Sequence, residues 1–438
     1  MSGATSFASD PGRVLSTVDD PAWSSCEQRI AASFARIAEV EPQVAAWREL
    51  DEERAMATAR SLDQHADAGH PCGPLHGVPF AIKDVIDVAG LPTRCQNAAR
   101  SASAPVSADA HLVGLLRQAG AVILGKAHTT EYAFFDPSPA RNPHNIKHTP
   151  GGSSSGSAAA VAAGMAAAAL GTQTVASVNR PAAYCGVAAF KPSTGALSTF
   201  GVTPLAPMFD TVGFFGWRVA DAVRLFEAIC PPYLQAQHQV AKSGPLRVLV
   251  LEDPLLDAAH DDVKQVMDVS AKRLRDAGHV LNAYKASIDF ASLYADQRHA
   301  MLYQTGRVHA ALLKLPQDML GEKLRAAITE GLAIDDNSFN SACARMETAR
   351  ATLLAQINDA DAVLWPAAPA TAPEGLEWTG DPAFISPWTA IGGPVVTVPT
   401  GNGSNGLPIA MLLTGKPGTD HNFAAVSNTL AKSLQDQD

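Results

Sequence analysis

The stretch from Gly151 to Gly171 concentrates small, uncharged residues, and it constrains the fold of this chain more than any other segment. It begins with GGSSSGS at 151–157 and continues as an alanine-rich run to Ala169. Alanine favours a helix, and side chains this small permit close packing in an interior. We therefore expect a buried helix that follows a glycine–serine loop, with a second loop from Gly171 to Ser177.

The glycine–serine loop has three competing interpretations. A flexible linker is the usual one for this composition, but a linker does not lead into an alanine-rich, uncharged helix. The loop also matches G-x-S-x-G, and a nucleophile elbow on Ser154 requires a hydrophobic strand just before it. Residues 144–150 are polar and end in a proline, which argues against that strand. A phosphate-binding P-loop is excluded because no lysine closes the glycine-rich segment.

Helical and strand patterns alternate along the chain. Helical spacing marks 24–47, 51–68, 108–119, 219–229, 261–276, 289–313 and 339–358, and short apolar runs mark 122–124, 247–251, 362–365 and 395–398. This alternation predicts an α/β fold in which helices cover both faces of a sheet. No repeat or linker divides the sequence, so we expect one large domain over residues 1–438. The charged segment 310–340 is a candidate lid or partner contact.

Composition and charge exclude several classes of protein. No apolar run reaches the length of about 18 residues that a membrane span requires, so we expect no membrane partner. The polar segment 1–23 lacks the pattern of a secretory signal, and the six cysteines are scattered without a C-x-x-C pair. These features predict a reduced, cytoplasmic protein. The net charge of −10 opposes binding to a phosphate backbone, so we expect no nucleic-acid partner.

The segment 78–83 alternates as a strand does, with Val78, Phe80 and Ile82 on one face and Lys83 on the other. A serine hydroxyl becomes a good nucleophile only when a neighbouring base takes its proton. A lysine can be that base if burial keeps it neutral. Asp84 would hold Lys83 charged if the two side chains met. Successive side chains of a strand point to opposite faces, so we expect Asp84 to point away from Lys83.

Three segments of the chain resemble a known family. GVPFAIKD at 77–84, GGSSSGS at 151–157 and LGTQTVASVNRPAAYCGV at 170–187 resemble, in order and spacing, the blocks of the amidase signature family. The similarity continues at 210–213, 361–366, 393–394 and 406–408, so it covers nearly the whole chain. Within the family, NPHN at 142–145, GTQT at 171–174 and Trp388-Thr389 look most similar to malonamidases.

This resemblance implies the amidase signature fold, a single α/β domain with a mixed sheet. The implied parts are N-terminal helices at about 24–68, a signature core at about 73–195 and a variable helical segment at about 260–358. The family chemistry requires neither a metal nor a cofactor. A small-molecule amide or carbamate is the implied partner, and a homodimer is a further expectation.

Carried over by position, Ser177 matches the nucleophile, Ser153 matches a bridging serine on a cis peptide bond, and Lys83 matches the base. The implied relay passes the proton of Ser177 through Ser153 to neutral Lys83. An acyl-enzyme forms and water hydrolyses it. Backbone N–H groups would form the oxyanion hole, and they belong to Thr174, Val175, Ala176 and Ser177.

The residues just before the nucleophile depart from the family pattern. The family usually has two glycines there, where this chain has Val175 and Ala176. A valine at positive φ is strongly disfavoured, so either this backbone has negative φ or the oxyanion loop is shifted. In both cases the two side chains reshape the acyl pocket. Substrate preference is affected more than the class of reaction.

Other candidate residues each have a structural alternative. Arg180 matches the position that binds the substrate carboxylate in malonamidase, and the alternative is an ion pair or a backbone clamp. Trp388 is a candidate wall of the substrate pocket, although aromatic residues are more often part of a core. His144 and His148 have the i, i+4 spacing of zinc-binding histidines, but the glutamate of that motif is absent and prolines flank them. We expect these histidines to form hydrogen bonds within a loop.

Three functions from different classes remain open at this point. The first is a stand-alone amidase on small carboxamides, with aryl amides, esters and carbamates as further candidates. The second is a component of an assembly, like the A-type subunit of the tRNA-dependent amidotransferase, which the acidic net charge opposes. The third is a non-catalytic relative that binds amides, which the presence of all three catalytic side chains opposes.

Overall fold

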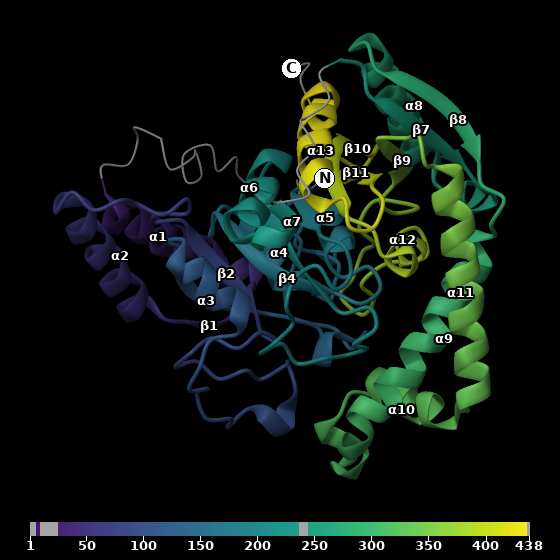
Figure 1. The fold of residues 1–438 in the computed structure, drawn as a ribbon. Coiled ribbons are helices and arrows are strands. Elements are labelled where there is room, and N and C mark those ends of the chain that lie inside the picture. Colours follow the sequence, from purple (N-terminus) through teal and green to yellow (C-terminus); the bar gives the residue numbers. More distant parts are fainter. Residues whose placement is uncertain (1–5, 9–24, 236–243, 436–438) are drawn as a thin grey trace.

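The computed structural model describes residues 6–8, 25–235 and 244–435, and the strands of these ranges form one 11-stranded sheet (Figure 1). The strand order is β1-β3-β2-β4-β6-β5-β10-β11-β9-β7-β8. β2 pairs in parallel with β3 and β4, and β7 pairs in parallel with β8 and β9, whereas the other pairs are antiparallel. The strands are β1 (Trp47–Leu50), β2 (Pro79–Lys83), β3 (Val122–Ala127), β4 (Ala168–Gln173), β5 (Ala188–Lys191), β6 (Thr211–Gly216), β7 (Arg247–Glu252), β8 (Val280–Lys285), β9 (Ala362–Pro366), β10 (Val395–Asn402) and β11 (Pro408–Thr414).

The helices begin at the polar residues that usually cap them. The side chains of Ser25, Asp51 and Asp335 accept hydrogen bonds from the first turns of α1, α2 and α11. The α-helices are α1 (Cys26–Val44), α2 (Glu52–Asp67), α3 (His111–Gln118), α4 (Ser155–Ala162), α5 (Asn179–Cys185), α6 (Val219–Ile229), α7 (Pro232–Gln235), α8 (Asp261–Asp276), α9 (Phe290–His309), α10 (Glu322–Ala333), α11 (Asp336–Gln356), α12 (Ser386–Ile391) and α13 (Asp420–Gln435). The expected helices at 219–229 and 261–276 have these bounds.

Two large buried clusters pack against the sheet, and at β2 they lie on opposite faces. Residues of α1, α2, α4 and α5 belong to one cluster, and residues of α3, α6, α8 and α13 belong to the other. Strand β2 contributes to both, because Phe80 and Ile82 lie in one cluster and Ala81 lies in the other. The predicted α/β class, with helices on both faces of a mixed sheet, is confirmed.

The alanine-rich run does not form one helix. α4 ends at Ala162, Gly164 turns the chain with a φ of 68°, and Ala168 begins strand β4. The prediction of a helix to Ala169 is therefore wrong in its second half, and the loop expected from Gly171 starts only after Gln173. β4 lies between β2 and β6 and is buried along its whole length. Sheet pairing and packing there override the helix propensity of alanine.

Helices α9, α10 and α11 pack together at the side of the molecule that is green in Figure 1. Two glycines allow α9 and α10 to approach closely: a Cβ atom on Gly331 would lie 1.9 Å from the carbonyl oxygen of Leu302. Helix α9 also packs against α12. The segment 310–340 falls mainly in α10 and its connections, and its role as a lid or partner contact stays a prediction.

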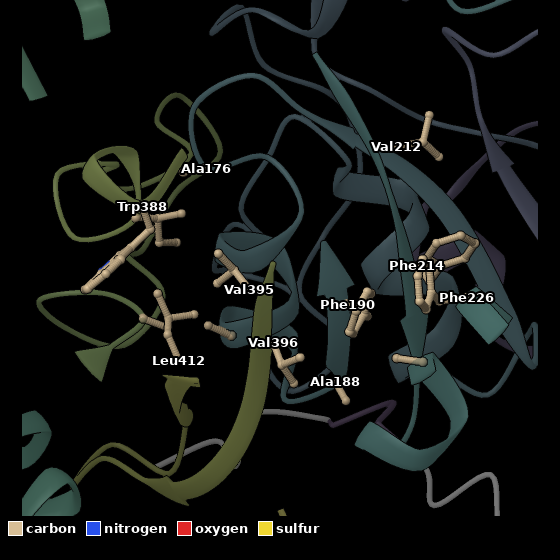
Figure 2. Packing of buried hydrophobic residues seen from close by; sticks show 14 of the residues in the cluster. Ala176, Ala188, Phe190, Val212, Phe214, Phe226, Trp388, Val395, Val396 and Leu412 are labelled. Carbon is tan, nitrogen blue, oxygen red and sulfur yellow. The ribbon is translucent and has the colours of Figure 1, made fainter. Parts of the chain in front are cut away.

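The larger hydrophobic cluster reaches from the aromatic residues of the sheet to the turn before Ser177. Phe190 stacks on Phe226 with ring centroids 4.7 Å apart. Ala176 and Trp388 belong to the same cluster (Figure 2). This packing gives the turn around Ala176 a rigid support.

Three expectations concern the environment of the chain. In the described ranges, no helix has both the length and the apolar character that crossing a bilayer requires. The cysteines of the described residues are all free thiols, as the scattered spacing predicts. The expectation of no secretory signal falls almost entirely on residues outside the described ranges.

Candidate active site

Lys83 is the last residue of β2, and its side chain is completely buried. Its Nζ lies 2.7 Å from Ser153 Oγ, 2.8 Å from Thr172 Oγ1 and 3.3 Å from the carbonyl oxygen of Thr172. A neutral amine has two N–H donors and one lone pair. If Thr172 accepts both N–H groups, the lone pair is left for the hydroxyl proton of Ser153.

Burial lowers the pKa of Lys83 well below 10.5. No carboxylate of the described residues lies within ion-pair distance of its Nζ. The largest opposing influence is the charge of Asp210, which raises the pKa of Lys83. Asp84 is held elsewhere, 3.0 Å from the Nζ of Lys126 in a fully buried ion pair. The ion pair with Lys126 therefore holds this carboxylate away from Lys83. The strand pattern predicts that Asp84 points away from Lys83, but it does not predict Lys126 as its partner.

Three hydroxyl groups of the glycine–serine loop donate to backbone carbonyls, and a fourth, that of Ser153, contacts Lys83. Ser154 Oγ donates to the carbonyl of Thr172, Ser155 Oγ to that of Gly151, and Ser157 Oγ to that of Leu170. These three serines therefore fix the loop to its surroundings. Ser153 contacts Lys83 instead, and the Gly152–Ser153 peptide bond is cis. An elbow nucleophile at Ser154 has no support, because its hydroxyl is fully buried and engaged.

In the turn 174–177, every carbonyl group is engaged in a hydrogen bond and every N–H group is left without a partner in the described residues. All four carbonyl oxygens accept hydrogen bonds, from Gln297 Nε2, Thr389 Oγ1, Arg180 N–H and Ser154 N–H respectively. In the part of the chain that the structure describes, no hydrogen bond uses the N–H group of Thr174, Val175, Ala176 or Ser177 as its donor. Buried N–H groups normally have partners. Four free donors beside a serine are what an oxyanion hole requires.

Ser177 ends this turn and is mostly buried. Its carbonyl accepts a hydrogen bond of 3.3 Å from the N–H of Ser154, the residue that follows Ser153. The structure therefore brings the three predicted catalytic residues together, through a direct side-chain contact between Lys83 and Ser153 and a main-chain contact from the Ser153–Ser154 segment to Ser177.

The side chain of Gln173 connects this turn to α5 and α12. Its Oε1 accepts the N–H groups of Val178 and Asn179 at the start of α5, and its Nε2 donates to Thr389 Oγ1. Thr389 in turn donates to the carbonyl of Val175 at 2.6 Å. Gln173 thus satisfies two donors at a helix N-terminus and fixes the carbonyl of Val175 through one intermediate.

The valine and alanine before Ser177 fit this turn with ordinary backbone angles. Positive φ occurs at five non-glycine residues of the described ranges, and neither Val175 nor Ala176 is among them. Of the two alternatives that the sequence leaves open, negative φ is therefore the one observed. Both side chains lie in the larger hydrophobic cluster, and Figure 2 shows Ala176 within it.

Gln297 is a residue of the site that sequence reasoning missed. It lies on α9, is fully buried, donates 2.9 Å to the carbonyl of Thr174, and accepts a hydrogen bond from Ser386 Oγ. Its partner Thr174 is 123 positions away in the sequence, and a glutamine within a helical pattern carries no local signal. Only the packing of α9 against α12 reveals its place.

Asp210 supports the same turn from the other side. Its carboxylate accepts hydrogen bonds from Thr174 Oγ1 at 2.6 Å and from the N–H groups of Leu205 and Ala206. Burial raises the pKa of Asp210, and these hydrogen bonds oppose that rise. These contacts give Asp210 a structural role in holding the turn.

Arg180 is buried beside the Ser153 loop without a carboxylate partner in the described residues. Its guanidinium donates to the carbonyls of Gly380 and Gly152 and to Thr379 Oγ1, and it lies 5.8 Å from the ring centre of Phe135. Its Nε has no hydrogen-bond partner in those ranges. Burial lowers the pKa of Arg180 to about 10. The hydrogen bonds to Gly380, Gly152 and Thr379 thus support the interpretation of Arg180 as a backbone clamp, and its Nε remains as a donor for an anion.

The other candidates occupy structural positions. Trp388 is buried on α12 and meets the ring of Phe290 edge to face at 5.3 Å, so its role in substrate binding stays a prediction. His144 contacts the carbonyl of Cys185, and His148 contacts that of Ala372. Both histidines therefore lie in a loop and form hydrogen bonds, as expected, and their partners belong to segments distant in sequence.

The fold and this site define a hydrolase of C–N bonds. The Amidase family model matches residues 28–423, so the chain belongs to the amidase family. A curated relative, the A-type subunit of the glutamyl-tRNA(Gln) amidotransferase of Symbiobacterium thermophilum, is 33% identical over 440 residues, which cover 89% of each chain.

Solved structures of amidases share the fold over most of its length. The peptide amidase of Stenotrophomonas maltophilia superposes with a TM-score of 0.80 at 27% identity, covering 94% of each chain. A chain from a vestigial protein complex, described as revealing the evolutionary origins of an s-triazine catabolic enzyme, superposes with a TM-score of 0.84 at 26% identity and covers 94% of this chain and 95% of that one.

We predict that kcat/KM for amide hydrolysis rises with pH through one ionisation well below 10.5, because only neutral Lys83 can accept a proton. The free energy of unfolding should rise with pH from that lowered pKa up to about 10.5, since over this range the unfolded chain holds the proton that the folded chain has lost. A pH–rate profile and urea titrations test both effects, with Lys83→Met as the comparison. A rate that still climbs toward pH 10.5 would contradict a depressed pKa.

We also predict that Gln297→Leu lowers kcat about 10- to 100-fold with a small change in KM, because the carbonyl of Thr174 loses its donor and the turn relaxes. Gln297→Glu keeps an acceptor for Ser386 and should show the same loss. Gln304→Leu on the same helix is the control, since Gln304 contacts the N–H of Met208 instead. Equal kcat in Gln297→Leu and the control would show that the glutamine only supports the fold.

Proposed function

We propose that this chain is a stand-alone amidase that cleaves small carboxamides through an acyl-enzyme on Ser177. The observation that carries the proposal is the turn 174–177, whose four carbonyls are all engaged and whose four N–H groups are free of partners in the described ranges. Such donors stabilise the negative charge on the oxygen of a tetrahedral intermediate, and each contributes about 2.7–4 kcal/mol in known cases.

The proton relay follows from the contacts of Lys83. Ser177 Oγ attacks the carbonyl carbon, its proton passes to Ser153 Oγ, and the proton of Ser153 passes to neutral Lys83 Nζ, 2.7 Å away. The tetrahedral intermediate collapses as the relay runs backwards and protonates the leaving amine. Water then attacks the acyl ester, with its proton following the same route, and releases the acid and free Ser177.

The substrate class follows from Arg180. A buried guanidinium beside the Gly152–Ser153 segment lacks a carboxylate partner in the described ranges, and its Nε is unpaired there. A substrate carboxylate close to the scissile amide would supply the missing charge. We therefore infer a preference for amides that carry a carboxylate a short distance from the amide carbon, as malonamate does. Esters and carbamates with the same carboxylate would react by the same attack.

The alternative function is that of an A-type subunit in a tRNA-dependent amidotransferase. The 33% identity to the Symbiobacterium thermophilum relative over 89% of both chains favours it. The net charge of −10 opposes a tRNA partner. Size-exclusion chromatography and copurification from the native host distinguish the two, because a component of such an assembly would elute with a protein partner or with tRNA.

We predict that Ser177→Ala lowers kcat for amides and p-nitrophenyl esters by at least about 10³-fold, because the attacking oxygen is removed. A fluorophosphonate probe should label the unmodified chain and leave Ser177→Ala unlabelled, and Lys83→Ala should reduce the labelling rate. Ser154→Ala is the matched control, since its hydroxyl is engaged with Thr172. Full activity in Ser177→Ala would overturn the assignment, and an inert wild-type chain would favour a non-catalytic amide-binding protein.

We further predict that Arg180→Lys raises KM for malonamate about 10- to 100-fold and leaves KM for a neutral amide of the same length nearly unchanged. Malonate should raise the Tm of Ser177→Ala but not of the double variant that also carries Arg180→Lys. The thermal measurement keeps the prediction testable even when activity is low. Equal losses on anionic and neutral amides would show that Arg180 serves only as a clamp for Gly152 and Gly380.

A further inference from the structure

A second cluster of reactive side chains lies at the N-terminal helices, outside the catalytic machinery. Cys26 is the first residue of α1, Asp63 lies near the end of α2, and His76 lies in the loop that leads into β2. The Sγ, carboxylate and imidazole ligand atoms all lie within 4.8 Å of one another. Three elements distant in sequence thus bring a thiol, a carboxylate and an imidazole to one point.

The backbone holds each of these residues in place. Asp63 accepts the N–H groups of Cys26 at 2.7 Å and Glu27 at 2.9 Å through its two carboxylate oxygens. Gly77 packs closely against the thiol of Cys26. A Cβ atom at this position would lie 2.5 Å from Cys26 Sγ, so a larger residue would not fit. Gly77 has a φ of 69°, so glycine is favoured there by conformation as well as by space.

The hydrogen bonds from the start of α1 to Asp63 explain why Cys26 and Asp63 lie together. They do not explain why the imidazole of His76 lies beside them. Each carboxylate oxygen of Asp63 keeps a further lone pair after accepting one N–H group. Cys26 is buried, whereas Asp63 and His76 are half-buried, so an ion has a route from solvent. The guanidinium of Arg29, which donates to the carbonyl of His76, adds a positive charge that the two anionic ligands offset.

We propose that Cys26, Asp63 and His76 form a binding site for one divalent ion of zinc-type chemistry. Thiolate, imidazole and carboxylate are the ligands that zinc uses, at about 2.0–2.3 Å, and three protein ligands with water in the fourth position is a common arrangement. Ligand atoms around such an ion lie about 3.5 Å apart, so side-chain rotations of about 1 Å close the site. Binding replaces the thiol proton of Cys26, and one proton is released for each ion.

The ion would connect α1 and α2 to the loop that enters β2. His76 lies three positions before Pro79, and Lys83 is at the far end of that strand, about 13 Å along it from Pro79. The ion therefore takes no part in the proton relay. Its effect would be on the stability of the N-terminal helices against the sheet, since an ion that binds only the folded chain stabilises it.

Cobalt(II) is the probe, because a cobalt–thiolate bond gives a charge-transfer absorption that carboxylate or imidazole binding does not give. The chelator-stripped, reduced chain is titrated in a Cys72→Ser background, so that the exposed Cys72 does not bind the ion. We expect one equivalent of cobalt to bind with this absorption, zinc to displace it, and Tm to rise. Hydrolysis at room temperature should stay the same with and without chelator.

Cys26→Ser should abolish the absorption, and His76→Gln should weaken cobalt binding at least about 10-fold. Cys343→Ser is the control, because Cys343 is a partly exposed thiol away from the cluster. If the background chain gives no thiolate absorption, or Cys26→Ser retains it, the site is refuted. Circular dichroism of each variant separates a lost ligand from a lost fold.

Discussion

The burial of Lys83 without a carboxylate partner among the residues that the structure describes is the constraint on which the rest of this molecule depends. A buried amine is stable when it is neutral or fully paired, and here its contacts are the oxygens of Ser153 and Thr172. The adjacent Asp84 is paired with Lys126 on the neighbouring strand. The two lysines therefore have different partners among the described residues: Lys126 forms a buried ion pair, whereas Lys83 contacts hydroxyl and carbonyl oxygens.

In the turn before Ser177, the buried carbonyl groups likewise all have hydrogen-bond partners. Its carbonyls are held by residues from α9, α12, α5 and the glycine–serine loop, so the direction of its N–H groups is set before a substrate arrives. Preorganised donors of this kind lose little energy to reorientation during the reaction. This also explains why Val175 and Ala176 are tolerated: the turn is fixed through its backbone oxygens and requires no left-handed residue.

Much of this arrangement could be predicted from local sequence. The alternation at 78–83 predicts that Lys83 and the apolar side chains occupy opposite faces, and periodicity gives the bounds of α6 and α8. The prediction of one helix over the alanine-rich run is wrong. The composition of the run favours a helix, but the centre of the sheet is occupied there by a strand of small residues. Gln297 and Lys126 carried no local signal, since their importance arises only from contacts made across the fold.

The wide sequence separation of these contacts has a consequence for synthesis of the chain. Thr389 is 214 positions beyond Val175, the residue whose carbonyl it holds. During translation Ser177 therefore leaves the ribosome long before the segments that hold its turn in place. A nascent or truncated chain that lacks α12 has Ser177 but not the contact that holds the carbonyl of Val175, so the geometry of the turn is complete only when the chain is nearly fully folded.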